Sequence, residues 1–381
     1  MALPEPGGPY KVGVIEVDLK APTTAGVVPC VIYYPAAVGA GATDKQPGLK
    51  WLDSDYAASL GRIHLRDTLG PRAGAFFMWT LGPAATGGAT VRGAVGAECA
   101  VSPDADGWPV AVLSHSLTGW RHVNSSFLAE IASRGAVAIG VEHCDGTSCR
   151  AATADGRELC EYVWWEDKAA ALVEAHGGDE KAAWAEGIEW RRGQLDVRVA
   201  EVTAALDGCG GALAAVGGVA RSGRRVAILG QSFGGACAAA CLARSDRFSH
   251  GLLFDPWLDG AGDGRYPLPP ADYAAGARPT CERLVVWQNG GSRLLESCGD
   301  NVAAFAATAK NAETILVDGA GHFAQTDAPA VFEGGPLASV YRALTSSEND
   351  APGTSSAALL ATATAETVAA LGTFFAGAPH Q

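Results

Sequence analysis

The sequence predicts an α/β fold in which a mostly parallel central sheet is covered by helices on both faces. From residue 109 onward, short apolar runs alternate with segments of helical spacing, the pattern of chains that build parallel sheets. In addition, the apolar run Val226 to Leu229 leads directly into Gly-Gln-Ser-Phe-Gly-Gly at 230–235. The length of 381 residues is enough for one large core, so we expect a single domain over 1–381.

The N-terminal third predicts an edge of the sheet followed by irregular chain. Extended runs at 12–17 and 28–34 lie close enough in sequence to form an antiparallel pair at the sheet edge. Gly and Pro occur throughout residues 36–108, which we expect to be irregular. An apolar patch, Phe76-Phe77-Met78-Trp79, lies within that segment.

The rest of the chain follows a strand, loop and helix rhythm. Residues 157–193 carry many charges and four Trp, which favours a helical insertion rather than core. Strands are predicted at 109–113, 136–141, 226–229, 251–254, 284–287 and 314–317, and helices at 125–133, 194–206, 236–242 and about 356–375.

Composition excludes some classes of function. A net charge of −13 and a pI near 5.0 argue against nucleic acid, and they disfavour tight docking to anionic membranes. The N-terminus has no basic region and no apolar core, so we expect no signal peptide and a cytoplasmic protein, with peripheral contact to membranes as a further option. Ten scattered Cys then indicate reduced thiols rather than a disulfide framework.

The segment 230–235 predicts a reactive serine. G-x-S-x-G between a strand and a helix is the nucleophile elbow of an α/β-hydrolase, in which a sharp turn presents the hydroxyl of Ser232. Gly230 and Gly234 leave room where the two backbones come close. The amide of Phe233 then lies at a helix N-terminus, where it can stabilise an oxyanion.

A serine nucleophile needs a base, and in this fold the chain order is Ser, then Asp or Glu, then His. His322 is the candidate, because Asp318-Gly319-Ala320-Gly321-His322 follows the last predicted strand. His380 is the penultimate residue and should fray. His250 precedes a predicted strand, at the wrong edge of the sheet.

The sequence pattern alone does not decide which carboxylate orients the histidine. Asp255 ends the predicted strand 251–254 at its carboxyl end, where catalytic groups of α/β sheets gather. Glu296 is the rival, in the loop after the next strand, and Asp259 and Asp300 are weaker alternatives.

A second oxyanion donor should come from a backbone amide in the loop 114–119. His115 in this loop precedes the elbow, so we interpret it as a structural rather than a catalytic residue. His143, Cys144, Asp145 and Cys149 match no zinc template, so we expect neither a metal nor a cofactor.

Several segments, taken in order, resemble the platelet-activating-factor acetylhydrolases of the plasma and type II intracellular kind. The elbow stands against the family's GHSFGG, and Leu253 to Trp257 stands against its LDAW. The other matching segments are 8–13, 31–35, 109–117 against PLVVFSHGL, 141–143 against VEH, and 319–322.

The resemblance implies a triad of Ser232, Asp255 and His322, with oxyanion amides at Leu117 and Phe233. It favours Asp255 over Glu296. It also implies calcium-independent hydrolysis of short or oxidised sn-2 acyl groups of phospholipids, the activity of a 1-alkyl-2-acetylglycerophosphocholine esterase. The family approaches lipid aggregates through apolar surface helices, and the patch Phe76 to Trp79 lies where one is expected. Ordinary core packing is the competing interpretation of that patch.

Three features depart from the family. Gln231 replaces its His in the elbow, Ser116 replaces a Gly beside the oxyanion hole, and 157–193 does not align. Two rival functions therefore stand beside the resemblance. One is a general carboxylesterase or polyester hydrolase of the same fold. The other is a catalytically dead lipid-binding protein.

Overall fold

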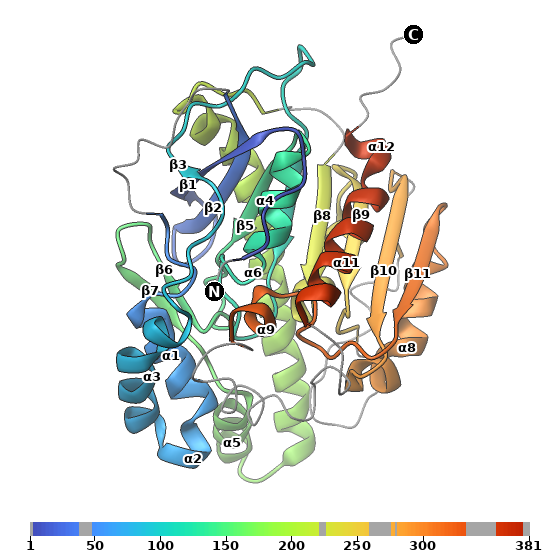
Figure 1. The fold of residues 1–381 in the computed structure, drawn as a ribbon. Helices are drawn as coiled ribbons and strands as arrows, with labels where there is room; N and C mark the ends of the chain where they lie inside the picture. The colour runs from blue at the N-terminus through green and yellow to red at the C-terminus, as the bar shows by residue number, and fades with distance from the viewer. Residues whose placement is uncertain are drawn as a thin grey trace.

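A mixed sheet in the order β11-β10-β9-β8-β4-β5-β2-β1-β3 runs through the molecule (Figure 1). The structure is a computed structural model that describes residues 3–37, 48–220, 226–258, 276–278, 280–332 and 356–375. The sheet strands are β1 (Lys11–Lys20), β2 (Val27–Ala36), β3 (Ala94–Val95), β4 (Val110–Ser114), β5 (Val137–Val141), β8 (Val226–Gln231), β9 (Phe248–Phe254), β10 (Arg283–Asn289) and β11 (Ala312–Val317). A separate hairpin pairs β6 (Arg150–Ala152) with β7 (Glu158–Glu161).

The central strands run parallel, as predicted. β5, β4, β8, β9, β10 and β11 pair in parallel from one to the next. β1 and β2 form the expected antiparallel pair, and β2 joins the rest of the sheet antiparallel to β5. The carboxyl ends of the parallel strands therefore meet at one edge, where ligand-binding groups of such sheets gather.

Helices cover both faces of the sheet, as predicted. Along β4, Val110 and Val112 pack into one core cluster, and Ala111 and Leu113 pack into the other. This alternation is what a strand buried on both faces requires. One face carries α4 (Ser125–Ser133), α9 (Asp327–Phe332), α11 (Ser356–Ala370) and α12 (Gly372–Phe375), and the other carries α6 (Glu180–Ala214), α7 (Phe233–Arg244) and α8 (Arg293–Ala306). In Figure 1, α4 and α11 lie in front of the sheet and α6 behind it.

Within the predicted irregular segment 36–108, residues 54–85 are helical, which corrects that part of the sequence prediction. They contain α1 (Ser54–His64), α2 (Arg66–Leu69) and α3 (Pro71–Ala85), with Asp53 capping α1. Two of the glycines in this segment, Gly61 and Gly74, have a packing role instead. A Cβ atom on Gly61 would lie 2.2 Å from the carbonyl oxygen of Gly74, so the absence of side chains lets α1 and α3 pack closely.

Residues 157–193 contain β7, α5 (Trp165–Ala175) and the first part of α6. The helix predicted at 194–206 is the middle of α6, which is 35 residues long and begins at the N-cap Asp179. None of the helices in the described ranges has the length and apolar character needed to cross a bilayer.

Candidate active site

Ser232 occupies a strained turn between β8 and α7. Its φ of 57° and ψ of −117° lie in a region that residues other than glycine rarely adopt. The turn is fixed on both sides, because the Ser232 amide donates to Phe254 O (3.0 Å) and its carbonyl accepts from the Trp257 amide (2.9 Å). The residue is 6% exposed, at the edge where the parallel strands end.

The two elbow glycines are sterically required. A Cβ atom on Gly230 would lie 1.9 Å from Gly234 O, and one on Gly234 would lie 2.0 Å from Ser114 O. These distances are far inside van der Waals contact, so larger residues would force the strand and helix backbones apart. The spacing of the pentad thus reflects the close approach of β8, α7 and the end of β4.

Asp255 and His322 form a close pair beside the elbow. Asp255 Oδ2 lies 2.6 Å from His322 Nδ1, although 67 residues separate them in sequence. Asp255 is almost fully buried at the end of β9, with φ at 41°, and its amide donates to Trp287 O at 2.7 Å. A carboxylate in this position fixes the imidazole so that the other ring nitrogen, Nε2, is the one available to a substrate or nucleophile.

Neutral carboxamides hold the loop that carries His322. Gln231 Nε2 donates to the backbone carbonyl of His322 at 2.9 Å, which ties this loop to the elbow itself. Asn289, at the end of β10, donates from Nδ2 to Gly321 O (2.8 Å) and to Gln325 Oε1 (2.7 Å). The backbone N–H of Asn289 donates to Asp255 Oδ1 at 3.2 Å, so Asn289 connects the Asp255 carboxylate with the loop that carries His322.

The alternative residues from the sequence lie elsewhere. Glu296 and Asp300 are exposed on α8, with Glu296 in its first turn. His250 lies within β9, fully buried, with its ring centroid 5.4 Å from that of Phe374. Asp259 and His380 fall outside the described residues.

The two predicted oxyanion residues belong to neighbouring segments. Phe233 is the first residue of α7, and amides in the first turn of a helix have no intrahelical acceptor. Leu117 lies in the turn after β4, where Thr118 has a φ of 57°. The Thr118 amide donates to Thr147 O at 2.8 Å, so this turn is fixed against the loop after β5.

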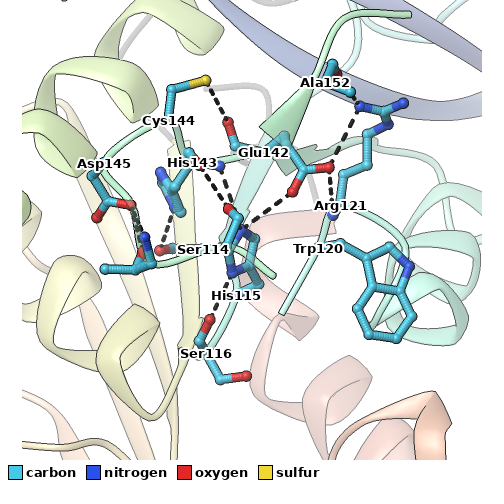
Figure 2. A network of polar contacts seen from close by, with 12 residues as sticks. Ser114, His115, Ser116, Trp120, Arg121, Glu142, His143, Cys144, Asp145 and Ala152 are labelled. Atoms are coloured by element: carbon cyan, nitrogen blue, oxygen red, sulfur yellow. Dashed lines mark hydrogen bonds and ion pairs between the residues drawn. The ribbon is translucent and has the colours of Figure 1, made fainter. Parts of the chain in front are cut away.

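A buried polar network lies beneath that turn (Figure 2). His143 Nε2 lies 2.8 Å from Ser114 Oγ, and its Nδ1 lies 2.8 Å from Glu201 Oε2 on α6. All three side chains are fully buried. Burial lowers the pKa of His143 well below its ordinary value, and burial raises the pKa of Glu201, so neither charged form is favoured. This Ser-His-Glu arrangement is inaccessible to substrate and is structural.

The outer part of the network is a chain of ion pairs. Arg121 Nε donates to Glu16 Oε1 at 2.6 Å, and its Nη1 lies 3.4 Å from Glu142 Oε2, as Figure 2 shows for Glu142. Tyr56 donates its hydroxyl proton to the same Glu142 oxygen at 2.7 Å. Burial raises the pKa of Glu142 to about 7, with the charge of Arg121 opposing the rise.

The cysteines near this network, Cys144 and Cys149, belong to no metal-binding cluster in the described part of the chain. There, no three His, Cys, Asp or Glu side chains gather in a way that would hold a metal ion. All ten cysteines are free thiols, and eight of them are buried.

The sequence reasoning missed four supporting residues. Asn289 and Gln325 gave no signal, because single amides beside a catalytic loop have no pattern of their own. Arg198 and Glu201 did give one. Both are fully buried on α6, in line with the apolar residues Leu195 and Val202, and a charge on an apolar helix face indicates a buried partner.

Comparison with known families identifies the group to which these features belong. A model of the family described as platelet-activating factor acetylhydrolase, isoform II, matches residues 1–209 and 217–343. The chain belongs to this family. The match includes all five predicted site residues and the whole of 36–108.

Individual relatives are distant and match only in part. A platelet-activating factor acetylhydrolase of Canis lupus familiaris is 25% identical over 187 residues, which cover 42% of this chain and 38% of the dog protein. One of Cavia porcellus is 27% identical over 169 residues, which cover 41% of this chain and 36% of that protein. The aligned segments thus span well under half of these relatives' own length.

Comparison with a solved structure supports the fold. A ferulic acid esterase from Streptomyces cinnamoneus superimposes with a TM-score of 0.56 and 18% identity, over 98% of this chain and 92% of the esterase. The α/β-hydrolase fold predicted from the elbow is therefore confirmed.

Proposed function

We propose that this chain is a serine ester hydrolase of the platelet-activating factor acetylhydrolase type. Ser232 is the nucleophile, His322 the general base and Asp255 the group that orients it. One observation carries the proposal: a serine in strained elbow geometry lies beside a buried Asp255–His322 pair joined at 2.6 Å. Such geometry costs free energy and persists where function requires it.

The first half of the reaction forms an acyl-enzyme. His322 Nε2 accepts the Ser232 proton as Oγ attacks the ester carbonyl, and the carbonyl electron pair moves onto oxygen. The amides of Leu117 and Phe233 donate to that oxyanion. Asp255 stabilises the imidazolium that forms. The ester oxygen then leaves with the proton from His322, as a lyso-phospholipid when a phospholipid is the substrate.

The second half releases the acyl group. Water loses a proton to His322 and attacks the acyl carbonyl, and the same two amides hold the second oxyanion. Its collapse returns the proton to Ser232 and frees the carboxylic acid.

Family membership supports a substrate with a short or oxidised acyl group at the sn-2 position of a phospholipid. The residues that differ from the family, Gln231 and Ser116, flank the triad and the oxyanion loop without belonging to the triad. We therefore propose that they affect acyl preference rather than the type of reaction.

The test is a hydrolysis panel with wild-type protein and Ser232→Ala. The panel contains sn-2 acetyl, oxidised and long-chain phospholipids beside nitrophenyl esters. We expect hydrolysis of the short and oxidised phospholipids and a loss of at least about 10⁴-fold in kcat for the variant. Full activity of Ser232→Ala would overturn the proposal.

The same panel separates the rivals. Turnover of nitrophenyl esters with none of any phospholipid would favour a general carboxylesterase or polyester hydrolase. No turnover, together with no labelling of Ser232 by a fluorophosphonate probe, would favour a catalytically dead lipid-binding protein.

We also propose that α3 contacts lipid aggregates through Phe76 and Trp79. Their side chains are 69% and 50% exposed, and Leu81 on the same helix is 44% exposed. Met78, which the sequence grouped with them, is a core residue at 8% exposure, so the core interpretation holds for part of the patch. Exposed aromatic residues on a short helix suit a lipid interface, and the net charge of −13 favours a zwitterionic one.

Sedimentation with phosphatidylcholine vesicles tests this contact. We expect a Phe76→Ser/Trp79→Ser double variant to sediment less than the wild type while it keeps activity on soluble esters. Leu316→Ser is the matched control, because Leu316 is 55% exposed on β11, an edge strand on the opposite side of the molecule from α3 (Figure 1). Equal sedimentation of all three proteins would contradict the proposal.

The free thiols support a reducing compartment such as the cytoplasm. Ten cysteines without a disulfide are typical of proteins kept in reducing surroundings. Fractionation of the native cells tests this, and recovery outside the cell would contradict it.

A further inference from the structure

A buried arginine on α6 lies between the two segments that carry the proposed oxyanion donors. The side chain of Arg198 is fully buried, and its Nη1 donates to His115 O at 2.6 Å. Its Nε donates to Asp145 Oδ2 at 3.0 Å, a carboxylate that is also fully buried. Its Cζ lies 4.6 Å from the ring centroid of Phe233. One guanidinium thus contacts the loop after β4, the loop after β5 and the start of α7.

The contact with His115 reaches the peptide that contains the Leu117 amide. His115 Nδ1 lies 2.7 Å from Ser116 O, and since a carbonyl only accepts, the ring nitrogen donates. Burial and the charge of Arg198 lower the pKa of His115 to about 3, which keeps the ring neutral and consistent with this tautomer. Ser116 C=O and Leu117 N–H belong to one planar peptide group. Fixing the carbonyl therefore fixes the direction of the amide proton.

The far side of the same turn is tied to the same guanidinium. The Thr118 amide donates to Thr147 O at 2.8 Å, and Thr147 Oγ1 accepts from Arg198 Nε at 3.2 Å. Ser116 and Thr118, the residues before and after Leu117, are thus each linked to Arg198 through one intermediate residue. Figure 2 shows the contact of His115 with Ser116 at this position.

The ring of Phe233 connects the arginine to the second donor. A guanidinium over an aromatic face is attracted by the ring quadrupole, and more strongly where water is excluded. Phe233 is fully buried, and its ring is also held by Trp257, at a centroid distance of 5.9 Å. The side chain that Arg198 contacts belongs to the residue whose amide is the other oxyanion donor.

Stability alone is a weak explanation for this arrangement. Burying an arginine and its carboxylate partner costs desolvation free energy that their attraction often only offsets. The planar guanidinium of an arginine, however, has several donors in fixed directions and can hold more than one acceptor in a defined geometry, which the ammonium of a lysine cannot do.

We propose that Arg198 is a positioning residue for the oxyanion hole, holding the Leu117 and Phe233 amides at a fixed separation. This inference rests on the proposed function, since it assumes that these two amides receive the oxyanion. Arg198 acts through its neighbours and does not touch the substrate.

The test compares Arg198→Lys with a matched control, Arg150→Lys. Arg150 is also buried, pairs with the carboxylates of Asp55 and Glu158, and has its Cζ 5.8 Å from a ring centroid, that of Tyr56. It contacts neither oxyanion segment in the described chain. We expect Arg198→Lys to lower kcat by about 10–100-fold with KM changed less than threefold, because a displaced donor weakens the transition state more than substrate binding.

A trifluoromethyl ketone provides the readout that a general loss of structure would not move. Ser232 adds to its carbonyl and gives a hemiketal oxyanion in the position of the tetrahedral intermediate. Its inhibition constant should rise in Arg198→Lys by the same factor by which kcat/KM falls. Arg150→Lys should leave both quantities near the wild-type values.

A second variant covers the case in which Arg198→Lys does not fold. Phe233→Leu removes the ring and keeps the amide, and we expect a fall of about 3–10-fold in kcat with a parallel rise in the inhibition constant. The inference is overturned if the folded Arg198 variant, or Phe233→Leu in its place, matches Arg150→Lys in both quantities. If Ser232→Ala stays active, the proposed function itself fails, so the two failures are distinct.

Discussion

The two halves of the candidate site are supported by different chemistry. The Asp255–His322 half is held by the neutral amides of Gln231, Asn289 and Gln325. The oxyanion half rests on charged groups, chiefly Arg198 with Asp145. The difference has an electrostatic reason. An extra charge beside a general base would shift its pKa away from its working range, whereas a fixed positive charge near a developing oxyanion does no harm and can help.

The largest effect should come from the acid itself. Asp255→Asn leaves the shape intact but removes the charge that stabilises the imidazolium, so we expect kcat to fall by about 10³–10⁴-fold. Steady-state kinetics beside Glu296→Gln checks this. The Glu296 variant should stay within about twofold of the wild type, because its carboxylate is exposed on α8. A large loss of kcat in the Glu296 variant together with a small loss in the Asp255 variant would assign the acid to Glu296 instead.

The charged half should make stability depend on acid pH. Burial would raise the pKa of Glu16, but the hydrogen bond from His122 and the charge of Arg121 together lower it from 4.5 to about 2. A carboxylate whose folded pKa is depressed stabilises the fold above the unfolded pKa, and this contribution is lost as pH falls from 4.5 through about 2. We expect Glu16→Gln to lower the free energy of unfolding by about 3 kcal/mol at pH 7 and by less than half of that at pH 3.

Urea unfolding at both pH values measures this contribution. Glu313→Gln is the control, because Glu313 pairs with Arg283 at the surface, where such pairs contribute about 0–1 kcal/mol. Equal losses for Glu16→Gln at pH 7 and pH 3 would show that the effect is one of packing and not of ionisation.

Adding a charge to the neutral half should lower activity and shift its pH dependence. Asn289→Asp turns a donor into an acceptor that faces Gly321 O, and it adds a carboxylate close to Asp255 and His322. We expect kcat/KM to fall by about 10–100-fold, and the acid limb of its pH profile to move to higher pH, because added negative charge favours the imidazolium.

Asn301→Asp is the control for this change, since Asn301 on α8 also donates to a carbonyl, Leu258 O at 2.8 Å. It should leave the pH profile in place. An unshifted profile for Asn289→Asp would mean that the neutrality of this half has no electrostatic role.

The smallest effect is expected at Gln231. Its Nε2 bonds to His322 O, but its Oε1 has no partner within the described chain, so the buried amide gains one hydrogen bond and leaves one acceptor unsatisfied. Gln231→Leu should therefore change the free energy of unfolding by less than about 1 kcal/mol while lowering kcat by about 3–10-fold. Kinetics and thermal unfolding of this variant and of Gln231→His, the family residue, check this; unchanged kcat in Gln231→Leu would remove the positioning role.

The sheet could be predicted from the sequence because its signals are local. Each buried parallel strand is a short apolar run, and α4 was predicted with its observed bounds, Ser125–Ser133. The helices between residues 54 and 85 could not be predicted this way. Gly61 and Gly74 resemble turn residues in sequence, and only the packing of α1 on α3 reveals why glycine is needed.

The residues of the candidate site likewise divide into those with a local sequence signal and those without one. The elbow at Ser232 and the loop of His322 have recognisable motifs. The choice of Asp255 over Glu296 needed the family resemblance, because both follow strands in a compatible order and only their distance from His322 separates them. The supporting amides at 289 and 325 have no local signal, since their role depends on partners that are far away in sequence.

The distribution of the thiols has a practical consequence. Eight of the ten cysteines are buried, and burial raises the pKa of several, including Cys30, Cys149 and Cys209. Thiolates rather than thiols react with alkylating reagents. In the folded chain these side chains are therefore protected both by burial and by their raised pKa values. Alkylation of these buried thiols in native buffer therefore reports the opening of the core around them, from Cys30 on β2 to Cys209 on the long helix α6.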